Sequence, residues 1–114
     1  MTPPIITLRG VSKIFSGHRA AVTAVDNVDL EIREGEIFGV IGYSGAGKST
    51  LVRLINALES TTSGTITVAG TEITGLPERK LREVRAGIGM IFQQFNLFAS
   101  RTVAGNVAYP LRVA

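Results

Sequence analysis

The stretch "GVIGYSGAGKST" combines residue types that could bind a phosphate group. It meets the spacing G-x-x-x-x-G-K-[ST] at Gly42, Gly47, Lys48 and Ser49, with a further glycine at Gly45. Glycines adopt backbone angles that are closed to other residues, and they let main-chain N–H groups crowd around an anion. A ring of such groups at the start of a helix forms a positive cavity. The stretch therefore predicts a loop that cradles phosphate.

The residues at the end of this stretch have separate expected roles. Lys48 is expected to reach the β- and γ-phosphates of a nucleotide, and the Ser49 hydroxyl to ligate Mg²⁺. Thr50 is expected to face the α-phosphate, and Tyr43 to point into solvent. The competing interpretation is a glycine-rich turn with an incidental lysine, and only the neighbouring elements can decide between the two.

Those neighbouring elements follow from the apolar pattern. Residues 37–41, "IFGVI", lack polar alternation and are predicted to form a central parallel strand that is buried on both faces. Residues 48–58 carry leucine and isoleucine at helical spacing and predict an amphipathic helix. A buried strand, a glycine loop and a helix in this order are the context that favours a phosphate loop.

The rest of the chain predicts a β-rich front and a mixed second half. Residues 22–32 alternate apolar and polar types, which is typical of a half-buried strand in an antiparallel sheet. The other expected elements are strands over 5–8 and 10–15, turns over 16–20 and 33–36, a hairpin of 64–68 and 72–73 turning at Gly70, a helix over 77–85, a second buried strand over 88–92, and a helix over 102–109 that Pro110 interrupts.

Composition bounds the kinds of protein this could be. A length of 114 residues allows one small domain. The absence of cysteine excludes disulfides and thiolate metal sites, and no apolar run or leading basic segment predicts a membrane span or a secretory signal. The net charge is only +3 and the basic residues are mostly interleaved with acidic ones, so no nucleic-acid partner is expected. His18 is expected in solvent, and the apolar stretch over 106–114 suggests a fragment.

Three stretches together resemble the N-terminal half of an ATP-binding-cassette (ABC) transporter ATPase: "ITLRGVSKIF", "AVDNVDLEIREGEIFGVIGYSGAGKSTLVRLINALESTTSGTITVAG" and "IGMIFQQFNLF". They cover nearly the whole chain, and the wording around the loop is similar to the ATPase subunits of bacterial methionine importers. The resemblance implies an α/β fold: a P-loop NTPase core with an antiparallel β accessory sheet, incomplete here. Residues 1–114 would be the N-terminal part of a single ABC ATPase domain, truncated before the signature motif and Walker B.

The resemblance also implies residue roles. Phe15 matches the aromatic residue that stacks on adenine, although by itself an aromatic residue at a strand end is more often core. Gln93 matches the glutamine that approaches Mg²⁺ and the attacking water, with Gln94 as the competing choice. Tyr43 and Gln94 depart from the usual family residues. The matching phosphate-loop residues are Gly42, Ser44, Gly45, Ala46, Gly47, Lys48, Ser49 and Thr50.

At the level of function, the resemblance implies the ATP-binding subunit of an amino-acid importer, with methionine as the expected solute. Its cofactors would be ATP and Mg²⁺, and it would act as a homodimer at the cytoplasmic face of the inner membrane. Its other partners would be the permease subunits and, indirectly, a substrate-binding protein. Ala104 and Gly105 stand where the family usually has a bulkier or acidic pair, in the region expected to touch the permease.

Other functions stay open at this stage. The alternatives are the ATPase of another importer or of a lipoprotein-release system, a soluble ABC protein of repair or translation, and a non-hydrolysing nucleotide-binding fragment. The resemblance implies that the signature sequence, the second acidic strand with its catalytic glutamate and the switch histidine are missing here, and residues 95–114 contain no Asp or Glu to position water. The chain alone is therefore expected to bind nucleotide weakly and to hydrolyse none.

Overall fold

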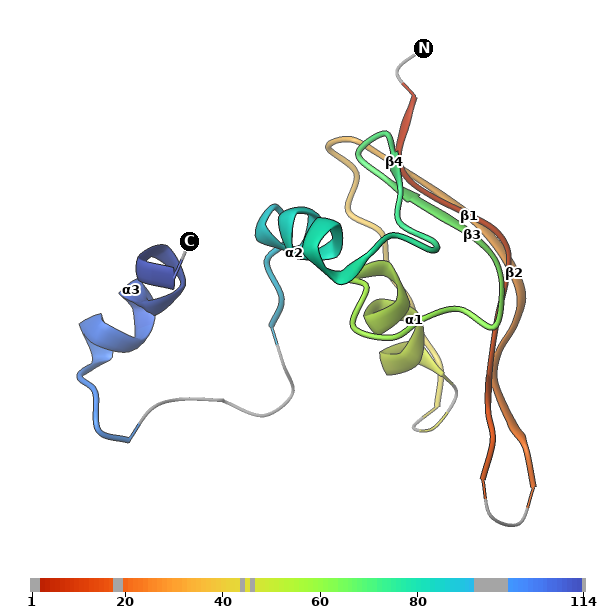
Figure 1. The fold of residues 1–114 in the computed structure, drawn as a ribbon, viewed down its shortest axis with the longest axis horizontal. Coiled ribbons are helices and arrows are strands. Elements are labelled where there is room, and N and C mark those ends of the chain that lie inside the picture. Colours follow the sequence, from red (N-terminus) through yellow and green to blue (C-terminus); the bar gives the residue numbers. More distant parts are fainter. Residues whose placement is uncertain (1–2, 18–19, 44, 46, 92–98, 114) are drawn as a thin grey trace.

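The computed structural model describes residues 3–17, 20–43, 45, 47–91 and 99–113. It contains a β-sheet, a helix packed on that sheet and two further helices (Figure 1). In chain order the elements are β1 (Pro4–Phe15), β2 (Val22–Arg33), α1 (Lys48–Ile55), β3 (Ser63–Val68), β4 (Thr71–Glu72), α2 (Glu78–Ala86) and α3 (Val103–Val113).

The sheet is antiparallel, with strand order β2-β1-β3-β4. β1 lies in its interior, because Leu8 pairs with Leu30 of β2 on one side and with Ile66 of β3 on the other. In β2 the predicted alternation is confirmed: Leu30 is half-buried and Glu31 is exposed. The predicted hairpin turn also forms, with Ala69 and Gly70 both at positive φ between β3 and β4. These observations confirm the antiparallel β layer.

A bulge at Gly10 changes the face that β1 presents to the core. Leu8 and Val11 are both buried although they are three residues apart, which a regular strand would not allow. The register with β2 shifts between these residues, and Gly10 has a φ of 56°. The Gly10 amide donates to the Asp29 carboxylate at 2.7 Å. The bulge thus gives β1 an apolar inner face along most of its length.

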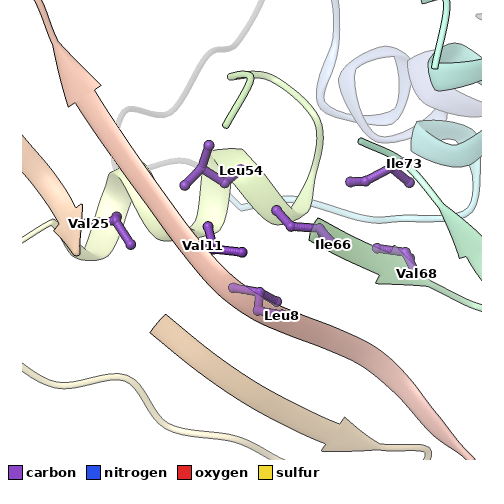
Figure 2. Packing of buried hydrophobic residues seen from close by; sticks show 7 residues of the cluster. All are labelled: Leu8, Val11, Val25, Leu54, Ile66, Val68 and Ile73. Carbon is purple, nitrogen blue, oxygen red and sulfur yellow. The ribbon is translucent and has the colours of Figure 1, made fainter. Parts of the chain in front are cut away.

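Helix α1 covers this inner face and closes the core (Figure 2). Leu54 of α1 is 1% exposed and belongs to the same buried cluster as Val11 and Ile66 of the sheet. The buried apolar residues are Leu8, Val11, Val25, Leu54, Ile66, Val68 and Ile73. Among the described residues, Leu54 is the one helical residue of this cluster, so α1 is the helix whose position depends on packing against the sheet.

The helices differ from their predicted bounds at the ends. α1 ends at Ile55 rather than at residue 58, since Ala57 takes a left-handed conformation with φ of 58°. α2 begins at Glu78 rather than at residue 77, and Pro77 occupies the N-cap position before it. Pro110 lies inside α3 and does not end it. Over the described residues, none of the helices has the length and apolar character needed to cross a bilayer.

The two predicted buried strands are wrong for the residues described. Residues 37–41 form no strand, and Ile37 and Ile41 are 100% and 96% exposed. Residues 88–91 form none either, and Ile91 is 99% exposed, while Phe92 lies outside the described residues. An apolar segment becomes a strand only when a neighbour satisfies its N–H and C=O groups. The described part of the chain places no such neighbour beside either segment.

Candidate phosphate-binding site

The glycine loop opens helix α1, as the sequence predicts. Gly45 and Gly47 have φ of 83° and 95°, a region that L residues with a side chain adopt only with strain. Gly47 precedes the helix directly, at the N-cap position, where it has no side chain that could cap the first turn. The amide of Leu51 donates to the Gly47 carbonyl at 2.9 Å. By helix geometry the amides of residues 48–50 therefore have no acceptor within the helix and remain able to bind an anion.

Gly47 is also fixed from the other side by the sheet. A Cβ atom at this position would lie 2.2 Å from the carbonyl oxygen of Ala24 in β2. Only glycine fits such an approach, so the sheet determines where the loop ends and where α1 begins. The strands therefore position the amino end of the helix, which carries the positive end of its dipole.

Lys48 lies across the loop that it follows. Its ammonium group donates to the carbonyl oxygen of Gly42, which is the first glycine of the loop. The side chain is half-buried, and α1 carries no acidic residue in its first turn. The cation is consequently held over the glycine loop, at the end of the helix where an anion would be stabilised.

The remaining loop positions can be placed in part. Ser49 is exposed in the first turn, which leaves its hydroxyl free to approach a cation, and Thr50 is half-buried beside it. Ser44 and Ala46 lie outside the described residues. Tyr43 is 92% exposed, so its predicted solvent orientation is confirmed.

Phe15 ends strand β1 and is 39% exposed, so it is not a core residue. The ammonium of Lys13 lies 5.1 Å from the centroid of its ring, and Lys13 also pairs with Glu59 at 3.4 Å. Lys13 and Glu59 are not among the residues predicted from sequence. The position of Lys13 two residues before Phe15 in a strand is the one local signal that could have indicated it, since such residues share a face.

Gln93, which was predicted to approach Mg²⁺, and its alternative Gln94 lie outside the described residues. His18, which was expected in solvent, lies outside them too. Within the ranges that are described, no three His, Cys, Asp or Glu side chains gather as a metal site would require. Among the described loop residues, Ser49 carries a hydroxyl oxygen that could ligate a Mg²⁺ ion, which beside phosphates usually takes few ligands from the protein.

A cavity of about 630 Å³ lies elsewhere, between the carboxyl end of α1, strand β3 and helix α2. Leu54, Thr62 and Leu81 are among its lining residues. None of the described loop residues lines it. The cavity is therefore separate from the loop, whose described residues Gly42, Tyr43 and Gly45 are exposed.

Comparison with known proteins gives a consistent picture. The family model "ABC transporter" matches residues 25–113. The chain is 69% identical over 111 residues to "Methionine import ATP-binding protein MetN 2" of Rhodococcus jostii (strain RHA1), covering 97% of this chain and 33% of that protein. It is 63% identical over 110 residues to "Methionine import ATP-binding protein MetN" of Corynebacterium glutamicum, covering 96% and 31%. The chain spans about a third of the length of these relatives.

Solved structures agree with the family. The fold is similar to a dimeric structure of the ATP-binding cassette MJ0796 in a post-hydrolysis state bound to ADP and Pi, with a TM-score of 0.88 and 35% identity. This similarity covers 95% of the present chain and 47% of that chain. A second structure of MJ0796, described as a bacterial ABC transporter cassette, has a TM-score of 0.89. Because the family model matches most of the chain and the fold is that of an ABC cassette, the chain belongs to the ABC transporter family.

Proposed function

We propose that this chain is the nucleotide-binding part of the ATP-binding subunit of a methionine importer. Residues 1–114 would form the N-terminal part of a single ABC ATPase domain, in keeping with their match to a third of the relatives' length. The names of those relatives support methionine as the solute and ATP as the nucleotide. In this role the subunit acts as a homodimer with permease subunits, at the cytoplasmic face of the inner membrane.

The observation that carries this proposal is the geometry of the loop. Gly47 opens α1 in a left-handed conformation, and the ammonium of Lys48 folds back over the loop to the Gly42 carbonyl. The amides of residues 48–50 point from the amino end of the helix, where negative charge is favoured. The loop thus combines backbone donors, a helix dipole and a cation, which are the features that bind a nucleotide's phosphates.

Each residue of the site has a definite task in this proposal. The loop from Gly42 to Thr50 would bind the phosphates, with Lys48 on the β- and γ-phosphates. Ser49 would hold Mg²⁺ together with Gln93, and Phe15 would stack on adenine. ATP supplies the phosphoanhydride bond whose hydrolysis resets the importer. The chain's own contribution, in the part that the structure describes, is to bind and orient the nucleotide.

The test is the removal of the Lys48 ammonium in the full-length protein. Lys48→Ala is expected to raise the Kd for Mg-ATP at least tenfold, which corresponds to about 1.4 kcal/mol, because the only side-chain cation of the loop is lost. Calorimetric titration measures this change. Lys80→Ala serves as the control, since Lys80 is exposed on α2 and its loss changes net charge equally.

Near-normal ATP binding in Lys48→Ala would contradict the assignment of the loop to phosphate. The solute is tested separately, by uptake of radiolabelled methionine in cells that lack the gene. Uptake should return with the wild-type gene and not with the Lys48→Ala gene. If the wild-type gene restored only the uptake of a different amino acid, the assignment of methionine would be wrong, and the assignment of the ATP site would be unaffected.

A further inference from the structure

A lysine is held against the aromatic ring at the end of β1. Lys13 and Phe15 lie two residues apart and so project from the same face of the strand. The Lys13 ammonium is 5.1 Å from the Phe15 ring centroid, within the range of a cation–π contact. The same ammonium lies 3.4 Å from a carboxylate oxygen of Glu59. Lys13 therefore connects the ring to the segment that follows α1.

The backbone around Lys13 is fixed on both sides by the segment between α1 and β3. The amide of Thr62 donates to the carbonyl of Ser12 at 2.9 Å, and the amide of Ile14 donates to the Thr62 hydroxyl at 2.9 Å. With the Glu59 ion pair, these contacts fasten the end of β1 to the chain that leaves α1. The side chain of Lys13 is only 13% exposed, which restricts it further.

We infer that Lys13 is a positioning residue for Phe15, which it holds in the orientation that stacks on a nucleotide base. This inference rests on the proposed function, in which Phe15 contacts adenine. A ring that is already oriented loses less rotamer freedom when the base arrives. Phe15 remains 39% exposed, so the contact with Lys13 leaves part of the ring open for the base.

The ion pair gives the Lys13 ammonium an anionic partner within the protein, which favours its place at the ring over a contact with phosphate. A free lysine side chain samples many rotamers, and its ammonium is drawn to any nearby anion. Glu59 supplies that anion within the protein, and its side chain is only 32% exposed. The pair thus commits Lys13 to the base side of the site, while Lys48 provides the cation at the loop.

The experiment compares two ligands in the full-length protein, Mg-ATP and Mg-tripolyphosphate, which has no base. Lys13→Met removes the ammonium and keeps the apolar stem, and it is expected to raise the Kd for ATP roughly two- to fivefold, the worth of an exposed to partly buried cation–π contact. The Kd for tripolyphosphate is expected to stay unchanged. Lys13→Arg keeps the cation and should restore ATP affinity, whereas Glu59→Gln should weaken ATP binding alone.

The matched control is Arg9→Met. Arg9 lies on the same strand, its side chain is 74% exposed, and its replacement changes the net charge equally. At about 3.3 Å per residue it is roughly 20 Å from Phe15 along β1, so neither ligand should lose affinity. In a Phe15→Leu background, Lys13→Met should have no further effect on ATP binding, because there is no aromatic ring left to orient.

The inference is overturned if Lys13→Met leaves ATP affinity unchanged, or if it weakens both ligands alike, which would indicate a phosphate contact or damage to the fold. A persistent effect in the Phe15→Leu background would overturn it too. A failure of the proposed function would give a different result. The wild-type protein would then bind ATP no more tightly than tripolyphosphate, and Phe15→Leu would change the Kd of neither ligand. Should Lys13→Met not fold, Glu59→Gln and Lys13→Arg provide the same comparison.

Discussion

Gly64 allows β3 to approach β1 closely beside the bulge at Gly10. It lies at the start of β3 with φ of 87°, and a Cβ atom there would be 2.3 Å from the carbonyl oxygen of Gly10. Gly64→Ala should therefore both strain its own backbone and push the bulge away. We expect a loss of about 2–5 kcal/mol in the free energy of unfolding, measured by urea denaturation.

A matched glycine separates the two causes of this loss. Gly75 has φ of 79°, but a Cβ atom there would meet nothing within 4 Å. Gly75→Ala should cost only the backbone strain, about 1–2 kcal/mol. Equal losses in the two variants would mean that the close approach to Gly10 contributes nothing to stability.

At the scale of elements, Arg85 joins α2 to the end of α1. Its guanidinium makes a hydrogen bond of 2.6 Å to the Glu78 carboxylate at the start of α2, and it donates to the carbonyl of Ala57 at 2.6 Å. The hydrogen bond from Arg85 lowers the pKa of Glu78 below its ordinary value of 4.5, against the smaller opposing effect of burial. The carboxylate likewise raises the pKa of Arg85.

This pair predicts a pH dependence of stability. Because the pKa of Glu78 is lowered in the folded protein, its contribution is fully present above pH 4.5 and is lost as the pH falls through the lowered value. Glu78→Gln should make the fall in stability below pH 4.5 shallower, as measured by urea midpoints over that range. Glu83→Gln, on the exposed part of the same helix, removes an equal charge and is the control for a general effect of net charge. If the urea midpoints of the wild type and of Glu78→Gln fell in parallel below pH 4.5, the ion pair with Arg85 would not be the cause of this pH dependence.

The elements also show what could be predicted from sequence. The alternation in β2 and the glycines of the loop are local signals, and both predicted their structures correctly. The apolar run over 37–41 predicted a strand that does not form. Apolar residues indicate a tendency to be buried, but a strand also needs a neighbouring strand that pairs with its backbone groups. The contact of Lys13 with Glu59 could not be predicted, because the two residues are distant in sequence and meet only through the packing of α1 on the sheet.

At the scale of the whole molecule, Leu54 joins the helix of the site to the sheet. It is 1% exposed and belongs to the buried cluster that also contains Val11 of β1 and Ile66 of β3 (Figure 2). Leu54→Ala should leave a cavity in the centre of the core and reduce the free energy of unfolding by about 2–5 kcal/mol in urea denaturation. Val52→Ala on the same helix, where Val52 is 42% exposed, should cost much less. Similar losses in both variants would mean that α1 does not depend on this core.

The interior place of β1 in the sheet affects how the chain is made. Once β2 has left the ribosome, β1 can pair with it as a local hairpin, but the opposite edge of β1 waits for β3. Roughly 35 residues separate the ends of β2 and β3, which take roughly 2–7 s to translate. During that interval the nascent hairpin offers open hydrogen-bonding groups to any extended chain nearby. Crowded polysomes, where identical hairpins emerge side by side, are consequently the setting in which this fold is most exposed to mispairing.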